Sequence, residues 1–249
     1  MNPFISGLKD KVILVTGGAS GIGLASVQAL AASGARVVCA DLQQSQDLPQ
    51  GCEFRRLDVI SEKLTHELVA SMLDRYGQID GLVTSAGISR VGDLESMALQ
   101  EWEQVLQVNL TGTMLSARAV ASHMKQRGRG SIVAIASING MLGNPSNLAY
   151  CTSKGAVIQM VRSLAADLGP CGVRVNSISP GYIHTPMTTM LDEQPVGQAF
   201  EAMHLLKRAG KSQEVGNAVA FLLSDMSSFI TGVNLPVDGG FSAAKVIAI

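Results

Sequence analysis

Short runs of apolar residues recur along the chain, and each is followed by a longer stretch with helical periodicity. Runs such as KVILV at 11–15 and SIVAIA at 131–136 do not alternate with polar residues, which is typical of strands covered on both faces of a sheet. Repetition of strand, helix and strand favours parallel pairing through right-handed crossovers. We therefore expect an α/β protein with a doubly wound parallel sheet of about seven strands, flanked by helices on both faces.

The individual elements can be placed from these patterns. Strands are expected at Val12–Val15, Arg36–Ala40, Glu53–Leu57, Gly81–Thr84, Ser131–Ala136, Arg174–Ile178 and Val233–Val237. Amphipathic helices are expected at Ile22–Ser33, Ser61–Tyr76, Glu101–Lys125, Leu148–Leu168 and Gln213–Leu223. No linker, low-complexity tract or shift in composition divides the 249 residues, so residues 1–249 are expected to form a single domain.

Composition argues against several classes of function. The formal net charge is only -1, which gives no electrostatic basis for binding nucleic acid or an anionic membrane. The longest apolar runs fall well short of the roughly 18 residues that span a bilayer, and the N-terminus shows no signal-peptide pattern. Four cysteines and four histidines lack the spacing of metal ligands. We therefore expect free thiols in a reducing cytoplasm, and no metal site.

A glycine-rich loop follows the first expected strand directly, as TGGASGIG at 16–23. Gly17, Gly21 and Gly23 stand where the chain must turn sharply and where the backbone can approach a ligand, because glycine lacks a Cβ. The next helix offers unpaired N–H groups and a positive dipole end to a pyrophosphate. The spacing differs from G-x-G-x-x-G, and a tight structural turn is the alternative, but the strand–loop–helix context favours a nucleotide site.

Asp41 ends the second expected strand, 18 residues beyond Gly23. A carboxylate at this place can accept hydrogen bonds from the hydroxyls of an adenosine ribose. It would also repel a 2′-phosphate, and neither Ser20 nor Leu42 provides a cation to neutralise one. NAD is therefore favoured over NADP, although an aspartate also suits a helix cap or a turn.

Tyr150 and Lys154 stand four residues apart in YCTSK. On a helix this spacing places both side chains on one face. The pair could be ordinary surface decoration, or it could be an acid and base arranged for proton transfer.

Taken together, these motifs resemble the classical short-chain dehydrogenase/reductase family over about Lys9 to Phe241. The matching motifs, in family order, are TGGASGIG at 16–23, Asp58-Val59, Ala86-Gly87, Asn109, Ser137, Tyr150 with Lys154, Pro180-Gly181 and Val237-Asp238-Gly239-Gly240. The resemblance implies a Rossmann-type domain and an NAD-dependent oxidoreductase that interconverts a secondary alcohol and a ketone by hydride transfer.

The resemblance also implies a catalytic set. Tyr150 would be the general acid/base, and Lys154 would activate it and bind the nicotinamide ribose. Ser137 would hydrogen-bond the reacting oxygen, and Asn109 would hold a water in a proton relay reaching Lys154. A phenol that titrates near 10 must shift by about three units, or roughly 4 kcal/mol, to act as a base at neutral pH. An ammonium ~4 Å away supplies roughly that energy at an effective dielectric constant of ~20.

Further cofactor contacts follow from the resemblance, with Asp58 and Val59 beside the adenine and the segment from Pro180 to Thr185 around the nicotinamide amide. The full expected set is Gly17, Ser20, Gly21, Ile22, Gly23, Asp41, Leu42, Asp58, Val59, Ala86, Gly87, Tyr150, Lys154, Pro180, Gly181, Ile183 and Thr185. One motif departs from the family, which usually carries Asn-Asn-Ala-Gly where Thr84-Ser85-Ala86-Gly87 stands here. The shorter hydroxyls put the rigidity of this loop in question.

The substrate side is less distinctive. The segment Tyr182–Arg208 shows no strand pattern and is expected to form short helices that act as a lid over the site. Its methionines suit a pliant apolar surface, although they could equally pack the segment onto the domain. We expect a medium-sized, partly apolar substrate contacted by Ser137, Asn139, Met141, Tyr150 and Met187.

Two other functions remain open. One is reduction of a 3-oxoacyl group on acyl carrier protein, against which Asp41 argues because such relatives usually prefer NADP. The other is a non-catalytic protein that senses NAD, against which the complete catalytic set argues. The resemblance further implies a homotetramer, with the helices at 101–125 and 148–168 and the apolar C-terminal tail at its interfaces.

Overall fold

The computed structural model describes residues 5–189 and 195–244. Its centre is a parallel sheet of seven strands in the order β3-β2-β1-β4-β5-β6-β9. The strands are β1 (Val12–Thr16), β2 (Arg36–Asp41), β3 (Glu53–Arg56), β4 (Gly81–Thr84), β5 (Gly130–Ile135), β6 (Val173–Pro180) and β9 (Asn234–Val237). The predicted doubly wound, Rossmann-type single domain is confirmed.

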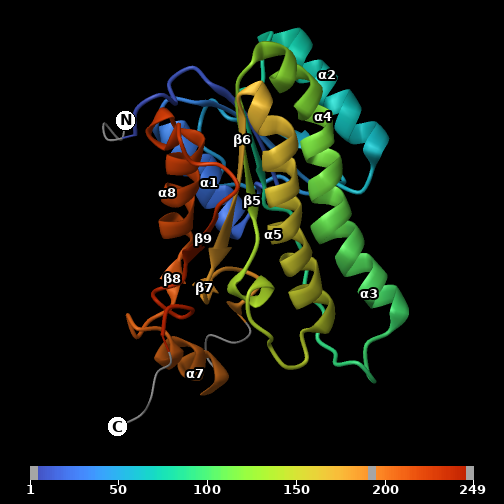
Figure 1. The fold of residues 1–249 in the computed structure, drawn as a ribbon, viewed down its shortest axis with the longest axis vertical. Coiled ribbons are helices and arrows are strands. Elements are labelled where there is room, and N and C mark those ends of the chain that lie inside the picture. The colour runs from blue at the N-terminus through green and yellow to red at the C-terminus, as the bar shows by residue number, and fades with distance from the viewer. Residues whose placement is uncertain (1–4, 190–194, 245–249) are drawn as a thin grey trace.

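Helices cover both faces of the sheet (Figure 1). One face carries α1 (Gly21–Ala32) and α8 (Ser212–Leu223), and the other carries α2 (Glu62–Tyr76), α4 (Gly112–Arg127) and α5 (Leu148–Leu168). Successive residues of β1 alternate between the two apolar cores, because Leu14 belongs to one and Ile13 and Val15 belong to the other. Two buried faces explain why the strand sequences are continuously apolar.

The helix expected at Glu101–Lys125 is not uniform. Its first part is α3 (Leu99–Leu106), and a π-helical turn at Gln107–Thr111 separates it from α4. Asn109 lies in this turn and is fully buried. Such π-helical turns occur frequently at functional sites.

The segment after β6 contains more regular structure than predicted. The two-residue strand β7 (Ile183–His184) pairs in parallel with β8 (Gly210–Lys211), and α7 (Pro195–Met203) lies between them. The expectation of a segment without strands was therefore wrong, because two residues are too few to produce an alternating pattern. Part of the expected lid, residues 190–194, lies outside the described residues. Within the described part of the chain, no helix has the length and apolar character needed to cross a bilayer.

Candidate active site

A continuous cavity of about 630 Å³ lies at the carboxyl ends of the central strands. The loops that follow β1, β2, β4, β5 and β6 all contribute to its walls. The expected cofactor-binding residues line it, with the exception of Gly23. Ser137, Tyr150 and Lys154 line the same cavity, so the sequence motifs that lie far apart along the chain meet at one place.

The glycine loop is shaped by its lack of side chains. Gly17 has a φ of +68°, and a Cβ at this position would overlap the backbone of Ala86 after β4. Gly21 has a φ of +50°, and a Cβ there would stand 3.4 Å from Thr185 Cβ across the cavity. A Cβ at Gly23 would overlap Gly17 O, so Gly23 packs within the loop and does not line the cavity. The loop thus leaves open the cradle that a pyrophosphate at the start of α1 requires.

Asp41 joins the glycine loop to the end of β2. Its Oδ2 accepts a hydrogen bond from the Ala19 N–H at 3.0 Å, and its Oδ1 accepts one from the Leu42 N–H at 2.7 Å. Of the described residues that line the cavity, Lys154 is the only cation. Among the described lining residues, the carboxylate therefore has no positive side chain beside it to offset its charge toward a ligand in the cavity.

Tyr150 and Lys154 project from α5 toward Ser137, which follows β5. Burial raises the pKa of Tyr150, a hydrogen bond with Ser137 lowers it in part, and Cys151 raises it further, so that the pKa lies above its usual value. Lys154 Nζ donates to Ile135 O at 2.8 Å and lies 5.7 Å from the centre of the Tyr150 ring. Burial lowers the pKa of Lys154 to about 8. Lys154 and Ser137 are buried and Tyr150 is half-buried, so the two titrating groups and the hydroxyl form one cluster at the cavity wall.

Asn109 lies behind this cluster rather than on the cavity wall. Its Oδ1 accepts from the Ile88 N–H at 2.8 Å, and its Nδ2 donates to Ile88 O and to Ser153 Oγ, both at 3.0 Å. A Cβ at Gly87 would stand 3.3 Å from Asn109 Oδ1 and 3.5 Å from Lys154 Nζ. Asn109 thus ties the loop after β4 to α5, next to the lysine.

The loop that departs from the family motif is held by other contacts. Thr84 is buried, and its Oγ1 has no hydrogen-bond partner among the described residues. The Ser85 N–H donates to Thr16 O at 2.9 Å, and the clamp from Asn109 to Ile88 follows shortly after. Hydrogen bonds of the backbone and of Asn109 therefore hold this loop, and the side chain of Thr84 contributes none.

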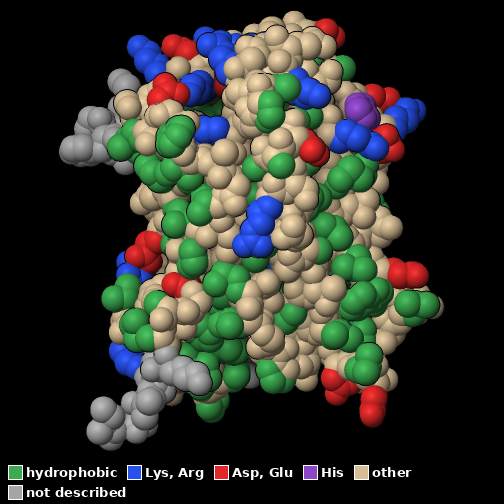
Figure 2. All heavy atoms as spheres, viewed as in Figure 1, with side chains coloured by type: hydrophobic (Ala, Val, Ile, Leu, Met, Phe, Trp, Pro, Cys, Tyr) green, Lys and Arg blue, Asp and Glu red, His purple; other side chains and the backbone are tan. Residues whose placement is uncertain are grey.

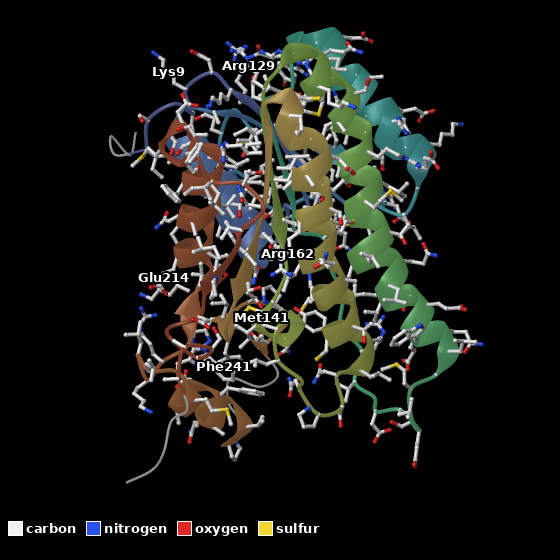
Figure 3. All side chains as sticks on the ribbon, viewed as in Figure 1. Lys9, Arg129, Met141, Arg162, Glu214 and Phe241 are labelled. Atoms are coloured by element: carbon white, nitrogen blue, oxygen red, sulfur yellow. The ribbon has the colours of Figure 1, made fainter. Side chains whose placement is uncertain are left out.

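The expected substrate residues are only partly brought together. Met187 lines the cavity with Ser137 and Tyr150, whereas Asn139 and Met141 are not among its lining residues. The short helical turn that follows Ser137 carries Met141 away to Asn234, whose Nδ2 donates to the methionine Sδ at 3.0 Å. Figure 3 shows Met141 between the lower end of α5 and the strand region.

Several lining residues were not foreseen from the sequence. They are Leu57, Ile60, Ser85, Ile88, Gln104, Gln107, Val108, Ile135, Ala136, Pro186 and Thr188. Gln104 and Gln107 could have been found from the sequence. They are three residues apart, so they share one face of a helix, and they come just before Asn109 in the chain. The described residues contain no group of three or more His, Cys, Asp or Glu side chains placed to hold a metal ion.

Comparisons with known proteins agree with this geometry. A family model described as "Enoyl-(Acyl carrier protein) reductase" matches residues 17–242. A 3-alpha-(or 20-beta)-hydroxysteroid dehydrogenase of Mycobacterium tuberculosis is 41% identical over 94% of this chain and 90% of its own length. A cyclopentanol dehydrogenase of a Comamonas species is 39% identical over 95% and 98%, respectively.

A solved structure has the same fold along almost the whole chain. It is the ligand-free aldohexose dehydrogenase of Thermoplasma acidophilum, which superposes with a TM-score of 0.91 at 33% identity and covers 98% of this chain and 99% of its own. The family model and the relatives cover the glycine loop, the expected catalytic residues and the segment after β6 alike. The chain belongs to the classical short-chain dehydrogenase/reductase family and is an oxidoreductase.

Proposed function

We propose that this protein is an NAD-dependent dehydrogenase that interconverts a secondary alcohol and a ketone, acting as a homotetramer in the cytoplasm. The observation that carries the proposal is the continuity of one cavity. It runs from the glycine loop and Asp41 to Ser137, Tyr150 and Lys154. Its volume of about 630 Å³ lies within the range of small-molecule sites, roughly 300–1,000 Å³.

The residues of the glycine loop fit a dinucleotide. The N–H groups at the start of α1 would hold the pyrophosphate, and Asp41 would accept from the ribose hydroxyls and repel a 2′-phosphate. Asp58 and Val59 would lie beside the adenine, and the walls from Pro180 to Thr185 would orient the nicotinamide. NAD bound there would supply the acceptor or donor of hydride.

The protein's own part in the chemistry is the movement of a proton. Tyr150 would take the proton of the substrate hydroxyl during oxidation and return it during reduction, while Ser137 holds the reacting oxygen by a hydrogen bond. Because burial raises the pKa of Tyr150, the phenol ionises near neutral pH only with help from positive charge. Lys154 and the oxidised nicotinamide ring would provide that charge.

The substrate that we propose is medium-sized and partly apolar. Met187 on the cavity wall supports an apolar surface, with the segment 182–208 acting as the lid. Cyclopentanol and hydroxysteroids are the natural probes, because two relatives carry these substrates in their names. An acetoacetyl thioester in the same panel, with NADPH, tests the carrier-protein alternative.

Absorbance of NADH provides the test. Tyr150→Phe is expected to lower turnover by about 10²–10⁴-fold while the affinity for NADH stays close to that of the unmodified enzyme. Tyr76→Phe is the matched control, because Tyr76 lies outside the cavity and donates instead to Glu53 Oε2. Unchanged turnover in Tyr150→Phe would refute the assignment, and NADH binding without turnover of any substrate would favour the non-catalytic sensor.

A further inference from the structure

His204 lies where three segments meet: the end of α7, the cavity-lining turn Pro180–Ile183 and the C-terminal segment around Phe241. Its side chain is buried, with 2% exposure. His204 Nε2 accepts a hydrogen bond from the Tyr182 N–H at 3.1 Å, and Nδ1 lies 2.7 Å from Phe200 O. An amide N–H can only donate and a carbonyl can only accept, so both bonds form only with the neutral ring protonated at Nδ1.

Packing fixes the ring as closely as the hydrogen bonds do. A Cβ at Gly181 would stand 2.7 Å from His204 Nε2, so only glycine fits beside the imidazole at the cavity wall. The rings of His204 and Phe241 lie 5.1 Å apart, and Phe200 of α7 stacks on Tyr182 at 5.5 Å. Figure 3 shows Phe241 in the space between α7 and the strands β7 and β8. The imidazole is thus a shared contact of all three segments.

We infer that His204 is a positioning residue that fixes the turn Pro180–Ile183 to α7 and so sets the coenzyme-facing wall of the cavity. The inference rests on the proposed function, because it takes this wall to hold the nicotinamide. Gly181 and Ile183 line the cavity on either side of Tyr182, whose N–H the imidazole holds. When the imidazole acceptor is lost, the turn can shift. Ordering the turn again on binding then reduces the affinity for the coenzyme.

Two substitutions separate the two hydrogen bonds. In His204→Gln the side-chain oxygen can reach the position of Nε2 and accept from Tyr182, whereas in His204→Asn the side-chain amide can reach only the position of Nδ1 and donate to Phe200 O. Both variants remove the imidazole and its contact with Phe241. A purely structural role would therefore affect both alike.

The dissociation constant of NADH, measured by fluorescence titration, gives the readout. We expect it to rise by about tenfold or more in His204→Asn and to stay within about threefold in His204→Gln, a difference of at least about 0.7 kcal/mol. Equal weakening in both variants, or a lowered Tm with unchanged binding in both, would overturn the inference. Wild-type protein that binds no NADH would instead overturn the proposed function, and this inference with it.

Hydrogen–deuterium exchange on the wild-type enzyme covers the case in which His204→Asn does not fold. Because the imidazole couples the turn to α7, saturating NADH is expected to slow amide exchange in Pro180–Ile183 and in Pro195–Met203 together. Slower exchange in the turn with no change in α7 would show that the two are not coupled, and would overturn the inference.

Discussion

Lys154 brings an amine into a site where its side chain is almost completely buried, with 4% exposure. Burial lowers the pKa from 10.5 to about 8, so between these values the unfolded chain binds more protons than the native protein. The free energy of unfolding should therefore rise with pH across this window. A shift of this size corresponds to about 3 kcal/mol.

Lys154→Met removes this titration and provides the test. The free energy of unfolding of the wild type, minus that of the variant, is expected to increase by about 3 kcal/mol between pH 7.5 and 10.5. The variant also loses the hydrogen bond to Ile135 O. That loss adds a constant to the difference in unfolding free energy and does not alter its dependence on pH. Urea unfolding at several pH values measures the difference, with Lys125→Met at an exposed position as the control. A difference that is flat with pH would contradict the prediction.

Thr84 buries a hydroxyl that has no partner among the described residues. Thr84→Val removes that cost and keeps the shape, so the free energy of unfolding should stay the same or increase by up to about 1 kcal/mol. In the control Thr65→Val, a buried hydroxyl that donates to Ser61 O at 2.9 Å is lost. That variant should be less stable by about 1 kcal/mol. Equal destabilisation of both proteins in urea would count against the argument.

Residues with distinctive chemistry could be found from the sequence, because their types and spacing carry information. Asp41, Ser137, Tyr150 and Lys154 are of this kind, and the structure places all four on one cavity. Ile135 and Ala136 also line it, but an apolar residue at a strand end looks the same whether it faces a ligand or a helix. The unpaired hydroxyl of Thr84 and the two hydrogen bonds of the His204 ring depend on segments that lie far apart in the sequence, so no local pattern could indicate them.

At the scale of elements, the glycine loop depends on the close approach of β1 and β4. Gly17 and Gly77 have nearly equal φ values of +68° and +70°, but a Cβ at Gly17 overlaps Ala86 whereas one at Gly77 meets nothing within 4 Å. Gly77→Ala should therefore cost only backbone strain, about 1 kcal/mol. Gly17→Ala should cost several kcal/mol in addition, because the backbone of Ser85 and Ala86 after β4 must move, and it should also abolish NADH binding.

Thermal unfolding and NADH titration of the two alanine variants distinguish these contributions. Similar Tm values for both would mean that the positive φ alone matters at Gly17, and that the contact with Ala86 does not. The matched pair thus isolates the packing of the loop from its conformation.

Elements with a long, regular pattern could be predicted closely. The bounds of α5 and β4 are those expected, because a continuous periodic run ends at each side in residues that break it. The π-helical turn could not be predicted, since it follows from the burial of Asn109 against Ile88 and Ser153, which come from other elements. The pairing of β7 with β8 joins residues 27 positions apart, Ile183 and Gly210, and has no signal in either segment alone.

At the scale of the whole molecule, no described segment of the chain lies over the outer side of α5 (Figure 1). In Figure 2 charged side chains gather toward the upper end of this face, while its middle is mainly uncharged, with backbone and polar side chains in tan, hydrophobic side chains in green and one basic group. Figure 3 shows Arg162 there, on the outer side of α5. Small exposed or half-buried residues, including Ala156 and Ser163, allow another helix to approach closely. A second copy of the chain would complete this surface, in agreement with the proposed homotetramer, whose expected C-terminal contacts at 246–249 lie outside the described residues.

Sedimentation tests the assembly. Four chains of 26.1 kDa give a particle of about 104 kDa, and Ser163→Trp on the outer face of α5 is expected to reduce it to dimers or monomers. In a symmetric interface both subunits carry the substitution, so two bulky side chains obstruct every contact. Ser71→Trp on α2 is the control, because Ser71 is also an exposed helical serine but lies on a helix outside the expected interfaces. A wild-type protein that sediments as a monomer at micromolar concentration would disprove the homotetramer. Sedimentation of Ser163→Trp as a full tetramer would place the contact on another face.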